Sequence, residues 1–299
     1  MPTESNNISS EIDAIIQQAM AEYAAAKGVD PFAPEESVIR EEPEPEIDES
    51  IPDEIPENSQ SVLVEETTSR FSSAIWYNKI QEKTITLAGL GGIGSYVAFL
   101  LARMQPYQLI VYDDDIVEAA NMSGQLYDSS CIGRSKVSSI SSLLINFASF
   151  YSVTTFTERF TVDSEATDIM ICGFDNMSAR RAFFRSWMNH VASKPESERK
   201  KCLFIDGRLA AESFQVLCIT GDDVFSQRRY SKDYLFSDAE ADETICSYKQ
   251  TTFMANMIGS VMVNLFVNFC ANECSPLIPR DLPFYTEYTA ETMYFKVIA

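Results

Sequence analysis

The sequence is poor in the residues that build many metal and hydrolase sites. It contains one histidine, His190, and its seven cysteines form no C-x-x-C pair. A single histidine excludes sites built from several histidines and leaves few options for a histidine-based triad. We find no signal-peptide pattern and no apolar run of about 18 residues, the length that a membrane span needs. Free thiols are typical of a reducing compartment, so we expect a cytoplasmic protein with no membrane partner.

Basic residues are also scarce. The chain of 299 residues has 23 Lys and Arg against 44 Asp and Glu, a formal net charge of -21. A nucleic-acid binder needs a cationic face, so the composition argues against a nucleic-acid partner. The acidic excess is concentrated near the start, because residues 1–60 hold 16 acidic residues and only two basic ones.

Residues 1–60 form what we call the acidic tail. It holds seven of the 12 prolines, and the stretch 41–57 is too charged and too rich in proline to build a core, which predicts disorder. Within it, apolar residues recur at helical spacing and predict a short helix over 10–27. Two interpretations of this helix stay open: a fraying helix on a flexible tail, or a tethered docking helix for a partner. We expect residues 61–299 to form one domain.

Short apolar runs alternate with helical patterns from residue 61 onward. The runs expected as strands are 84–89, 108–113, 152–156, 168–173, 202–207 and 214–220, and two short strands are expected within 285–298. The helical patterns cover 94–104, 135–147, 178–192 and 251–270. This alternation predicts an α/β fold, a Rossmann-like and mostly parallel sheet with helices on both faces and a C-terminal antiparallel edge.

A glycine-rich turn, AGLGGIGS (88–95), follows the first expected strand and opens a helix. Gly89, Gly91 and Gly94 fit the pattern G-x-G-x-x-G, which lets a phosphate approach the backbone N–H groups at a helix start. Asp113 ends the next strand, where a carboxylate accepts hydrogen bonds from ribose hydroxyls. The turn therefore predicts nucleotide binding, but alone it does not distinguish NAD from ATP.

Further motifs follow the turn in order, in YDDDIVEAANMSGQLYDSSCIGRSK and DIMICGFDNMSARRAF. Together they resemble the ThiF/MoeB/HesA adenylyltransferase family, which has a ubiquitin-activating-enzyme-like fold. Its motifs are GxGGIGS, L-x-D-x-D, N-x-x-R-Q, G-x-x-K and D-N-x-x-x-R. The positions that match are Gly91, Gly92, Ile93, Gly94, Ser95, Asp113, Asp115, Asn121, Gln125, Gly133, Lys136, Asp175, Asn176 and Arg180. The segment 70–80 resembles the family's lead-in helix, and the resemblance covers roughly residues 70–270.

The resemblance implies an ATP-dependent adenylyltransferase, in which a carboxylate attacks the α-phosphate of MgATP and pyrophosphate leaves. It implies that Lys136 contacts the phosphates and that Asp175 holds Mg²⁺. The residues that it implies for nucleotide binding are Gly91, Gly92, Ile93, Gly94, Ser95, Asp113, Asn121, Gln125, Lys136 and Asn176. The expected partner is the C-terminus of a ubiquitin-like or sulfur-carrier protein, or another carboxylate. Relatives pair through this domain, so we expect a homodimer, an expectation that the apolar pattern of 251–270 also favours.

Several positions leave alternatives open. Asn121 and Gln125 are either nucleotide contacts or loop amides that bond their own backbone. Arg180 either contacts ATP or fixes the loop that carries Asp175, and Arg208 is either a carboxylate or phosphate contact or a structural ion-pair partner. Asp114 is interpreted as a solvated turn acid.

The chain also departs from the family pattern. Gly124 stands where the family has the arginine of N-x-x-R-Q, and Ser73 replaces an arginine of the lead-in helix. Arg70, Arg134 or Arg208 are the candidates to replace that charge. The paired C-x-x-C zinc motif is missing, so we expect no structural zinc.

Cysteine chemistry is a separate hypothesis. Cys246 precedes the last long helix, and a helix start with Lys249 nearby favours a lowered pKa, so Cys246 is a candidate for a later thioester step. Its alternative is a buried residue, and Cys131 is a second candidate. Cys172, Cys202 and Cys218 are interpreted as core residues, and His190 as a surface or core residue of its helix.

Three functions compete at this point. The first is the adenylyltransferase, the second an NAD-dependent oxidoreductase on the same glycine turn, and the third a non-catalytic interaction module that has lost its arginines. The oxidoreductase assigns no role to Asn121, Gln125, Lys136 or Asp175, which makes it the weakest of the three.

Overall fold

The computed structural model describes residues 67–236 and 250–298 of the chain. The acidic tail, with the helix predicted over 10–27, lies outside the described residues, and so do Cys246 and Lys249.

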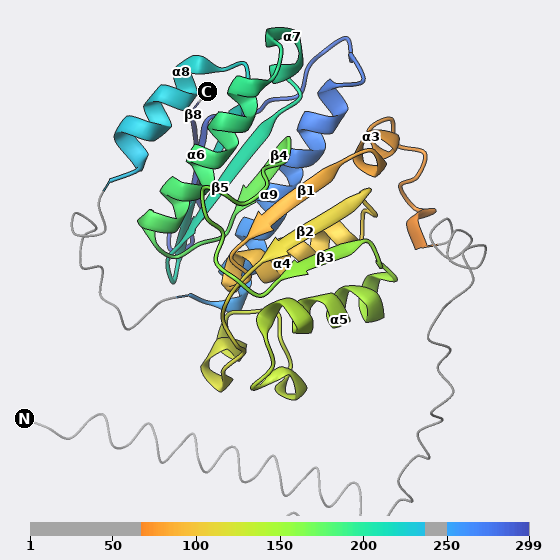
Figure 1. Ribbon diagram of the computed structural model, residues 1–299, viewed down its shortest axis with the longest axis vertical. Coiled ribbons are helices and arrows are strands. Elements are labelled where there is room, and N and C mark those ends of the chain that lie inside the picture. Colours follow the sequence, from red (N-terminus) through yellow and green to blue (C-terminus); the bar gives the residue numbers. More distant parts are fainter. Residues whose placement is uncertain (1–66, 237–249, 299) are drawn as a thin grey trace, which may run out of the picture. The chain divides into compact units, whose positions relative to one another are not determined.

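An eight-stranded sheet forms the centre of the described domain, in the order β3-β2-β1-β4-β5-β6-β7-β8 (Figure 1). Its strands are β1 (Thr84–Ala88), β2 (Gln108–Tyr112), β3 (Val153–Phe156), β4 (Ile169–Cys172), β5 (Leu203–Leu209), β6 (Ser213–Thr220), β7 (Tyr285–Thr289) and β8 (Tyr294–Ile298). The strands from β3 to β5 pair in parallel, and β6, β7 and β8 add antiparallel pairs. The predicted fold class, with its antiparallel C-terminal edge, is confirmed.

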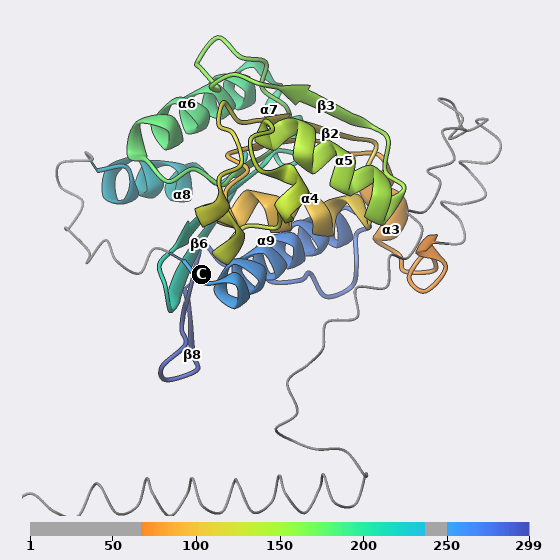
Figure 2. The same ribbon diagram turned by 90° about the horizontal axis from the view of Figure 1, so that it is seen from below.

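Helices cover both faces of the sheet, as Figure 2 shows. One face carries α4 (Gly92–Ala102), α5 (Lys136–Ala148) and α9 (Thr252–Asn272), and the other carries α6 (Met177–Ser193) and α8 (Val224–Arg229). The shorter elements are α3 (Tyr77–Gln81), α7 (Glu196–Arg199), the 3-10 helices η1 (Ala119–Ser123) and η2 (Ser129–Cys131), and the π-helical turn η3 (Tyr230–Tyr234).

Two hydrophobic cores lie on opposite sides of the sheet. On β4, Ile169 and Ile171 join the core beneath α4, α5 and α9, and Met170 and Cys172 join the core beneath α6. Successive side chains of a strand point to opposite faces, so a strand covered on both faces reads as an unbroken apolar run. This is why the central strands can be recognised from sequence.

Helix α9 is long and apolar enough, by length and composition, to cross a membrane, but 56% of its most apolar window is buried inside the domain. It packs along α4, where Gly259 allows close contact with Tyr96. The residues that it exposes include Asn256, Ser260 and Asn264. The apolar character of α9 is therefore explained by its place in the core, and the homodimer stays a prediction.

The lead-in segment is less helical than its family resemblance implies. Only Tyr77–Gln81 form the helix α3, and the stretch before it consists of turns, in which Thr68 O accepts hydrogen bonds from Phe71 N and Ser72 N. Ring contacts among Phe71, Trp76 and Tyr77 hold these turns together. Turn hydrogen bonds and aromatic packing together therefore shape this end of the domain.

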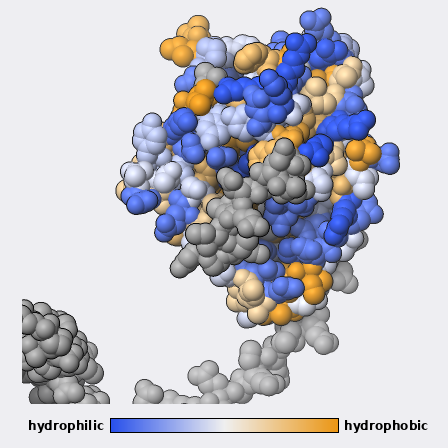
Figure 3. Space-filling view, turned by 90° about the vertical axis from the view of Figure 1, so that its left-hand side faces the viewer, coloured by the Kyte–Doolittle hydropathy of each residue, from blue (hydrophilic) through white to orange (hydrophobic). Residues whose placement is uncertain are grey.

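On the face drawn in Figure 3, hydrophilic and hydrophobic residues are interspersed among the coloured atoms. The exposed apolar residues of the described chain include Val224 and Phe225 of α8 and Met293, Tyr294 and Val297 near the last strand. Single exposed apolar residues are ordinary on a protein surface, so these do not by themselves indicate a binding face.

Candidate active site

The glycine turn lies between β1 and α4 and is packed too closely for larger residues. Gly89 has φ +85°, in the region that favours glycine, and a Cβ there would lie 2.8 Å from the carbonyl carbon of Gly173 in the turn after β4. A Cβ on Gly94 would lie 1.8 Å from the oxygen of Gly89. Side chains are thus excluded at these two positions, and the turn leads directly into the N-terminus of α4, whose first N–H groups are the kind that bind an anion.

This turn lies at the point where the chain, after adding strands on one side of β1, adds the next strand on the other side. From β1 the chain passes to β2 on one side, whereas β4 pairs with the other side of β1. The arrowheads of β1 and β2 in Figure 1 point to the edge that carries the turn. In open α/β sheets the crevice at the carboxyl ends of such strands is the usual place for a ligand.

Asp113 follows β2 at the same edge and is tied to the glycine turn. Its Oδ2 accepts a hydrogen bond from Leu90 N at 2.6 Å, and its Oδ1 accepts one from Asp115 N at 2.9 Å. Burial raises the pKa of Asp113, although Lys136 and these two N–H groups act in the opposite direction. The carboxylate therefore helps to shape the turn, and both of its oxygens are engaged by backbone donors.

Lys136, the first residue of α5, reaches back to the same edge. Its side chain is only 7% exposed, and Nζ lies 2.8 Å from Oδ2 of Asp115, whose own side chain is 64% exposed. Ser135 caps α5 through a hydrogen bond from Ser138 N. The sequence motif thus places a buried lysine whose partner, Asp115, faces solvent and can exchange its contact for one with a ligand.

Gln125 is buried beside the glycine turn, and its Oε1 has no hydrogen-bond partner among the residues that the structure describes. Its Nε2 lies 3.8 Å from the place that a Cβ on Gly91 would occupy. Buried polar groups are nearly always paired, so an unpaired amide against the glycine turn points to a ligand that completes it.

Two neighbouring polar residues of the motif are used by the protein itself. Ser95 is fully buried, and its Oγ accepts a hydrogen bond from Leu126 N at 3.0 Å. Asn121 Oδ1 accepts one from Glu118 N at 2.9 Å, within a capping box at the start of η1. These contacts fix the segment that carries Gln125. The Oδ1 of Asn121 bonds the backbone of its own loop, which is one of the two alternatives that the sequence left open.

Asp175 and Asn176 are exposed in the turn after β4. Asn176 caps α6, because its Oδ1 accepts a hydrogen bond from Ala179 N at 2.8 Å, and its Nδ2 lies 3.2 Å from Oδ1 of Asp175. The carboxylate of Asp175 is therefore oriented by its neighbour and remains open to solvent at the carboxyl edge of the sheet.

Arg180 connects the turn that carries Asp175 to the core of the domain. It is buried, forms an ion pair with Asp206, and donates hydrogen bonds to the carbonyl oxygens of Phe174 and, at 3.0 Å, Gly207. Burial lowers the pKa of Arg180, but Asp206, Cys172, Tyr230 and Asp175 together outweigh that effect, so the net pKa is raised. Of the two alternatives for Arg180, the structure supports the one in which it fixes the loop that carries Asp175.

Asp206 is the centre of this buried network and was not singled out from the sequence. Besides Arg180 it accepts hydrogen bonds from Arg208 Nε at 3.0 Å and from Tyr230 Oη at 2.9 Å. Arg208 also donates to the carbonyl oxygen of Tyr234 at 2.7 Å. Arg208 is thus a structural ion-pair partner, which answers the other open alternative.

Ser73 and Gly124 stand at the two positions where the family has arginine. Ser73 is exposed in the turns before α3. Gly124 is buried, and a Cβ there would lie 2.7 Å from Cγ of Gln250, whose Oε1 in turn occupies the space above Gly92. A neutral amide from the start of α9 therefore fills the space beside the position where the family has arginine.

Other candidates lie further from the turn or outside the described chain. Asp114 pairs with exposed Arg159 at 2.7 Å, in agreement with a surface role. Cys131 is buried in η2, and Cys246 falls outside the described residues, so its role rests on the sequence alone.

Comparison of the sequence with known proteins identifies a matching family. The model of the ThiF family matches residues 64–298. Among curated proteins, the chain is similar to ubiquitin-like modifier-activating enzyme 5 of Caenorhabditis elegans, with 33% identity over 122 residues, 36% of this chain and 29% of that protein. The same enzyme of Dictyostelium discoideum is 30% identical over 158 residues, 45% of this chain and 42% of that protein. The matched region thus spans well under half the length of these relatives.

Solved structures show the same fold at low identity. Selenomethionine PaaA has a TM-score of 0.57 at 13% identity, covering 99% of this chain and 86% of that chain. E. coli MccB with ATP has a TM-score of 0.54 at 16% identity, covering 75% of this chain and 65% of that chain.

Proposed function

The chain belongs to the ThiF family, and from that premise we propose that it is an ATP-dependent adenylyltransferase. In the proposed reaction a carboxylate oxygen attacks the α-phosphorus of ATP, the bond to the β-phosphate breaks, and pyrophosphate leaves. The product is an acyl-adenylate. Such a reaction asks the protein to position its substrates and to neutralise spreading negative charge, rather than to form covalent bonds of its own.

The observation that carries the proposal is the buried amide of Gln125 near Gly91, whose Oε1 has no hydrogen-bond partner in the described part of the chain. A nucleotide seated on the glycine turn would supply the missing hydrogen-bond partner, and its phosphates would meet the N–H groups at the start of α4. The residues present therefore fit ATP. Asp113, held beside Leu90, lies at the strand end where a ribose is bound.

Two charged residues are assigned distinct tasks. Lys136 supplies a positive charge to the phosphates, and in the absence of a ligand Asp115 holds it in place. Asp175 is the residue that would hold Mg²⁺, a hard cation that takes few carboxylates together with phosphate oxygens. Arg180 and Asn176 act on Asp175 by fixing its loop and orienting its carboxylate.

We propose as the substrate the C-terminal carboxylate of a ubiquitin-like or sulfur-carrier protein. Support comes from the relatives, whose names describe activation of ubiquitin-like modifiers. A later transfer to Cys246 is proposed from sequence alone, as are the homodimer and the cytoplasmic location.

The test is exchange of labelled pyrophosphate into ATP, measured with Mg²⁺ and a carrier protein that ends in Gly-Gly. Replacing Lys136 by Met should reduce the exchange rate on the order of 10²-fold, as loss of one preorganised charge contact does. Lys201→Met is the matched control. Lys201 forms an exposed ion pair with Glu198, just before β5 and so at the amino edge of the sheet, and its loss should leave exchange unchanged.

Calorimetric titration with ATP and with NAD separates the remaining possibilities. Tighter binding of NAD than of ATP would contradict the proposal. Exchange in the wild type that Lys136→Met leaves intact would contradict the assigned role of Lys136.

One observation favours a second candidate, a nucleotide-binding module without catalysis. Gln250 packs against Gly124, where the family has arginine, so a neutral group replaces a charge that would face the leaving pyrophosphate. This candidate predicts ATP binding without exchange for every carrier or small carboxylate tested. Pyrophosphate exchange therefore decides between the two.

A further inference from the structure

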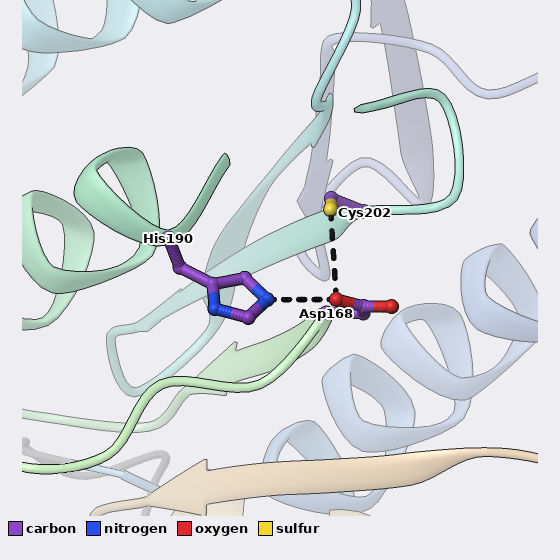
Figure 4. A group of neighbouring side chains, drawn as sticks. All are labelled: Asp168, His190 and Cys202. Carbon is purple, nitrogen blue, oxygen red and sulfur yellow. Dashed lines mark hydrogen bonds and ion pairs between the residues drawn. The ribbon is translucent and has the colours of Figure 1, made fainter. Parts of the chain in front are cut away.

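At the edge of the sheet opposite the glycine turn, three side chains from different elements meet (Figure 4). Asp168 precedes β4, His190 lies near the end of α6, and Cys202 precedes β5. One ligand atom from each lies within 4.8 Å of the other two. We propose that Asp168, His190 and Cys202 form a binding site for a borderline transition-metal cation such as Zn²⁺.

The kinds of atoms favour this class of metal. A thiolate, an imidazole nitrogen and a carboxylate oxygen together suit Zn²⁺ or Co²⁺, whereas Mg²⁺ prefers oxygen ligands alone. The site therefore differs in chemistry from the proposed magnesium site at Asp175. It also differs from the paired C-x-x-C motif whose lack led us to expect no structural zinc.

A positively charged side chain, that of Lys194, already contacts the cluster. Lys194 Nζ lies 2.6 Å from Oδ1 of Asp168, the same oxygen that lies 2.7 Å from Nε2 of His190. Asp168 and His190 also line an open groove of about 830 Å³. Its lining includes hydroxyl, amide and carboxylate groups, and the described residues that line it include no lysine or arginine. Its carboxylates are Glu158, Asp163, Glu165 and Asp168. Such a lining concentrates cations near the cluster.

The distances are compatible with coordination after a small rearrangement. Tetrahedral zinc with bonds of about 2.0–2.3 Å places its ligand atoms roughly 3.3–3.8 Å apart. Sγ of Cys202 lies 3.8 Å from Oδ1 of Asp168, within that range, whereas the imidazole at 2.7 Å must move outward by more than half an ångström. The side chain of His190 is 25% exposed and can make this movement.

Binding has a defined stoichiometry. The metal forms bonds to Oδ1, Nε2 and Sγ, the ammonium of Lys194 leaves Oδ1, and the thiol of Cys202 releases one proton to solvent. No electron is transferred. Asp168 and His190 line the groove and Cys202 is buried, so a fourth ligand would reach the metal from the groove. A three-ligand site with an open position of this kind binds water or a small anion.

The experiment is titration of the reduced, nucleotide-free full chain with Co²⁺, followed by optical absorption. A thiolate bound to Co²⁺ gives a ligand-to-metal charge-transfer band in the near ultraviolet. We expect this band to saturate at one Co²⁺ per chain. His190→Gln should weaken Co²⁺ binding roughly 10-fold or more, at least as much as loss of a second-shell partner does. Lys194→Met should tighten it roughly 2- to 5-fold, because the metal then has no partly exposed ion pair to break.

Cysteine variants complete the test. Cys202→Ser should abolish the band. Cys218→Ser is the control and should leave the band intact, because Cys218 is a buried cysteine of β6 that does not belong to the cluster. If Cys202→Ser does not fold, the opposite effects of His190→Gln and Lys194→Met still test the site. No band in the wild type, a band that persists in folded Cys202→Ser, or weaker binding by Lys194→Met would overturn the proposal. None of these results depends on the proposed adenylyltransferase activity.

Discussion

Arg180 offers the most direct test of how the domain supports its candidate site. Its guanidinium is buried, pairs with fully buried Asp206, and holds the carbonyl oxygen of Phe174. Arg180→Met removes the cation and leaves a carboxylate buried with Arg208 and Tyr230 as its remaining partners. Breaking a buried pair from one side costs about 3–5 kcal/mol. We expect a value near the lower end, about 3 kcal/mol, because two partners remain.

Urea unfolding of the wild type and Arg180→Met measures this loss as a change in midpoint at constant slope. A double-mutant cycle with Asp206→Asn isolates the pair. We expect the double variant to be more stable than the sum of the single changes by about 1–3 kcal/mol, the coupling typical of groups in one buried network. Arg185→Met is the control, because Arg185 is exposed on the same helix, and its change should stay within about 0.5 kcal/mol.

The same variant has a functional consequence. Without Arg180, the turn that carries Asp175 loses its attachment to the core, so Mg²⁺-dependent ATP binding should weaken in the variant that is still folded. A cost below about 1 kcal/mol, or a coupling energy near zero, would show that Arg180 is not the anchor that its contacts indicate.

Three further results are expected. Gly94→Ala should destabilise the glycine turn, because its methyl group would lie 1.8 Å from a backbone oxygen, whereas Gly91→Ala meets only an ordinary contact and should unfold in urea much as the wild type does. Burial raises the pKa of Asp113, so its carboxyl should titrate by NMR above the usual value of about 4, and Lys136→Met should raise it further. Ionisation of Asp113 therefore costs stability that returns as the pH falls through its raised pKa. Because the acidic tail lacks a core-forming composition, a chain that begins at residue 61 should melt at about the same temperature as the full chain.

Local patterns were sufficient to predict much of the sheet. The runs 84–89 and 214–220 correspond closely to β1 (Thr84–Ala88) and β6 (Ser213–Thr220), because buried strands are short, apolar and bounded by turns. The glycine turn was equally visible, since its residues are adjacent in sequence. Helix α3 was the exception, because the segment before it forms turns in which aromatic rings pack together, an arrangement that spacing does not reveal.

Long-range partners account for what the sequence left open. Arg180 had two interpretations until the structure paired it with Asp206, 26 residues further along the chain. For the same reason Cys202 was interpreted as a core residue and His190 as a surface or core residue of its helix, and Asp168 was not singled out. These three residues come together only because β4 and β5 start at one edge of the sheet and α6 returns to that edge.

Helix α6 connects the two edges, and its length indicates how the two sites influence each other. Arg180 in its first turn fixes the Asp175 loop, and His190 near its end belongs to the proposed metal site. These residues are ten positions apart, about 15 Å along the helix axis. The Debye length at physiological ionic strength is about 8 Å, so a charge at one end is largely screened at the other where the path crosses solvent. A metal ion at His190 should therefore stabilise the domain without changing its affinity for ATP. A change in ATP affinity on adding Zn²⁺ that His190→Gln abolishes would instead require α6 itself to shift, since its two ends are joined by a continuous run of helix.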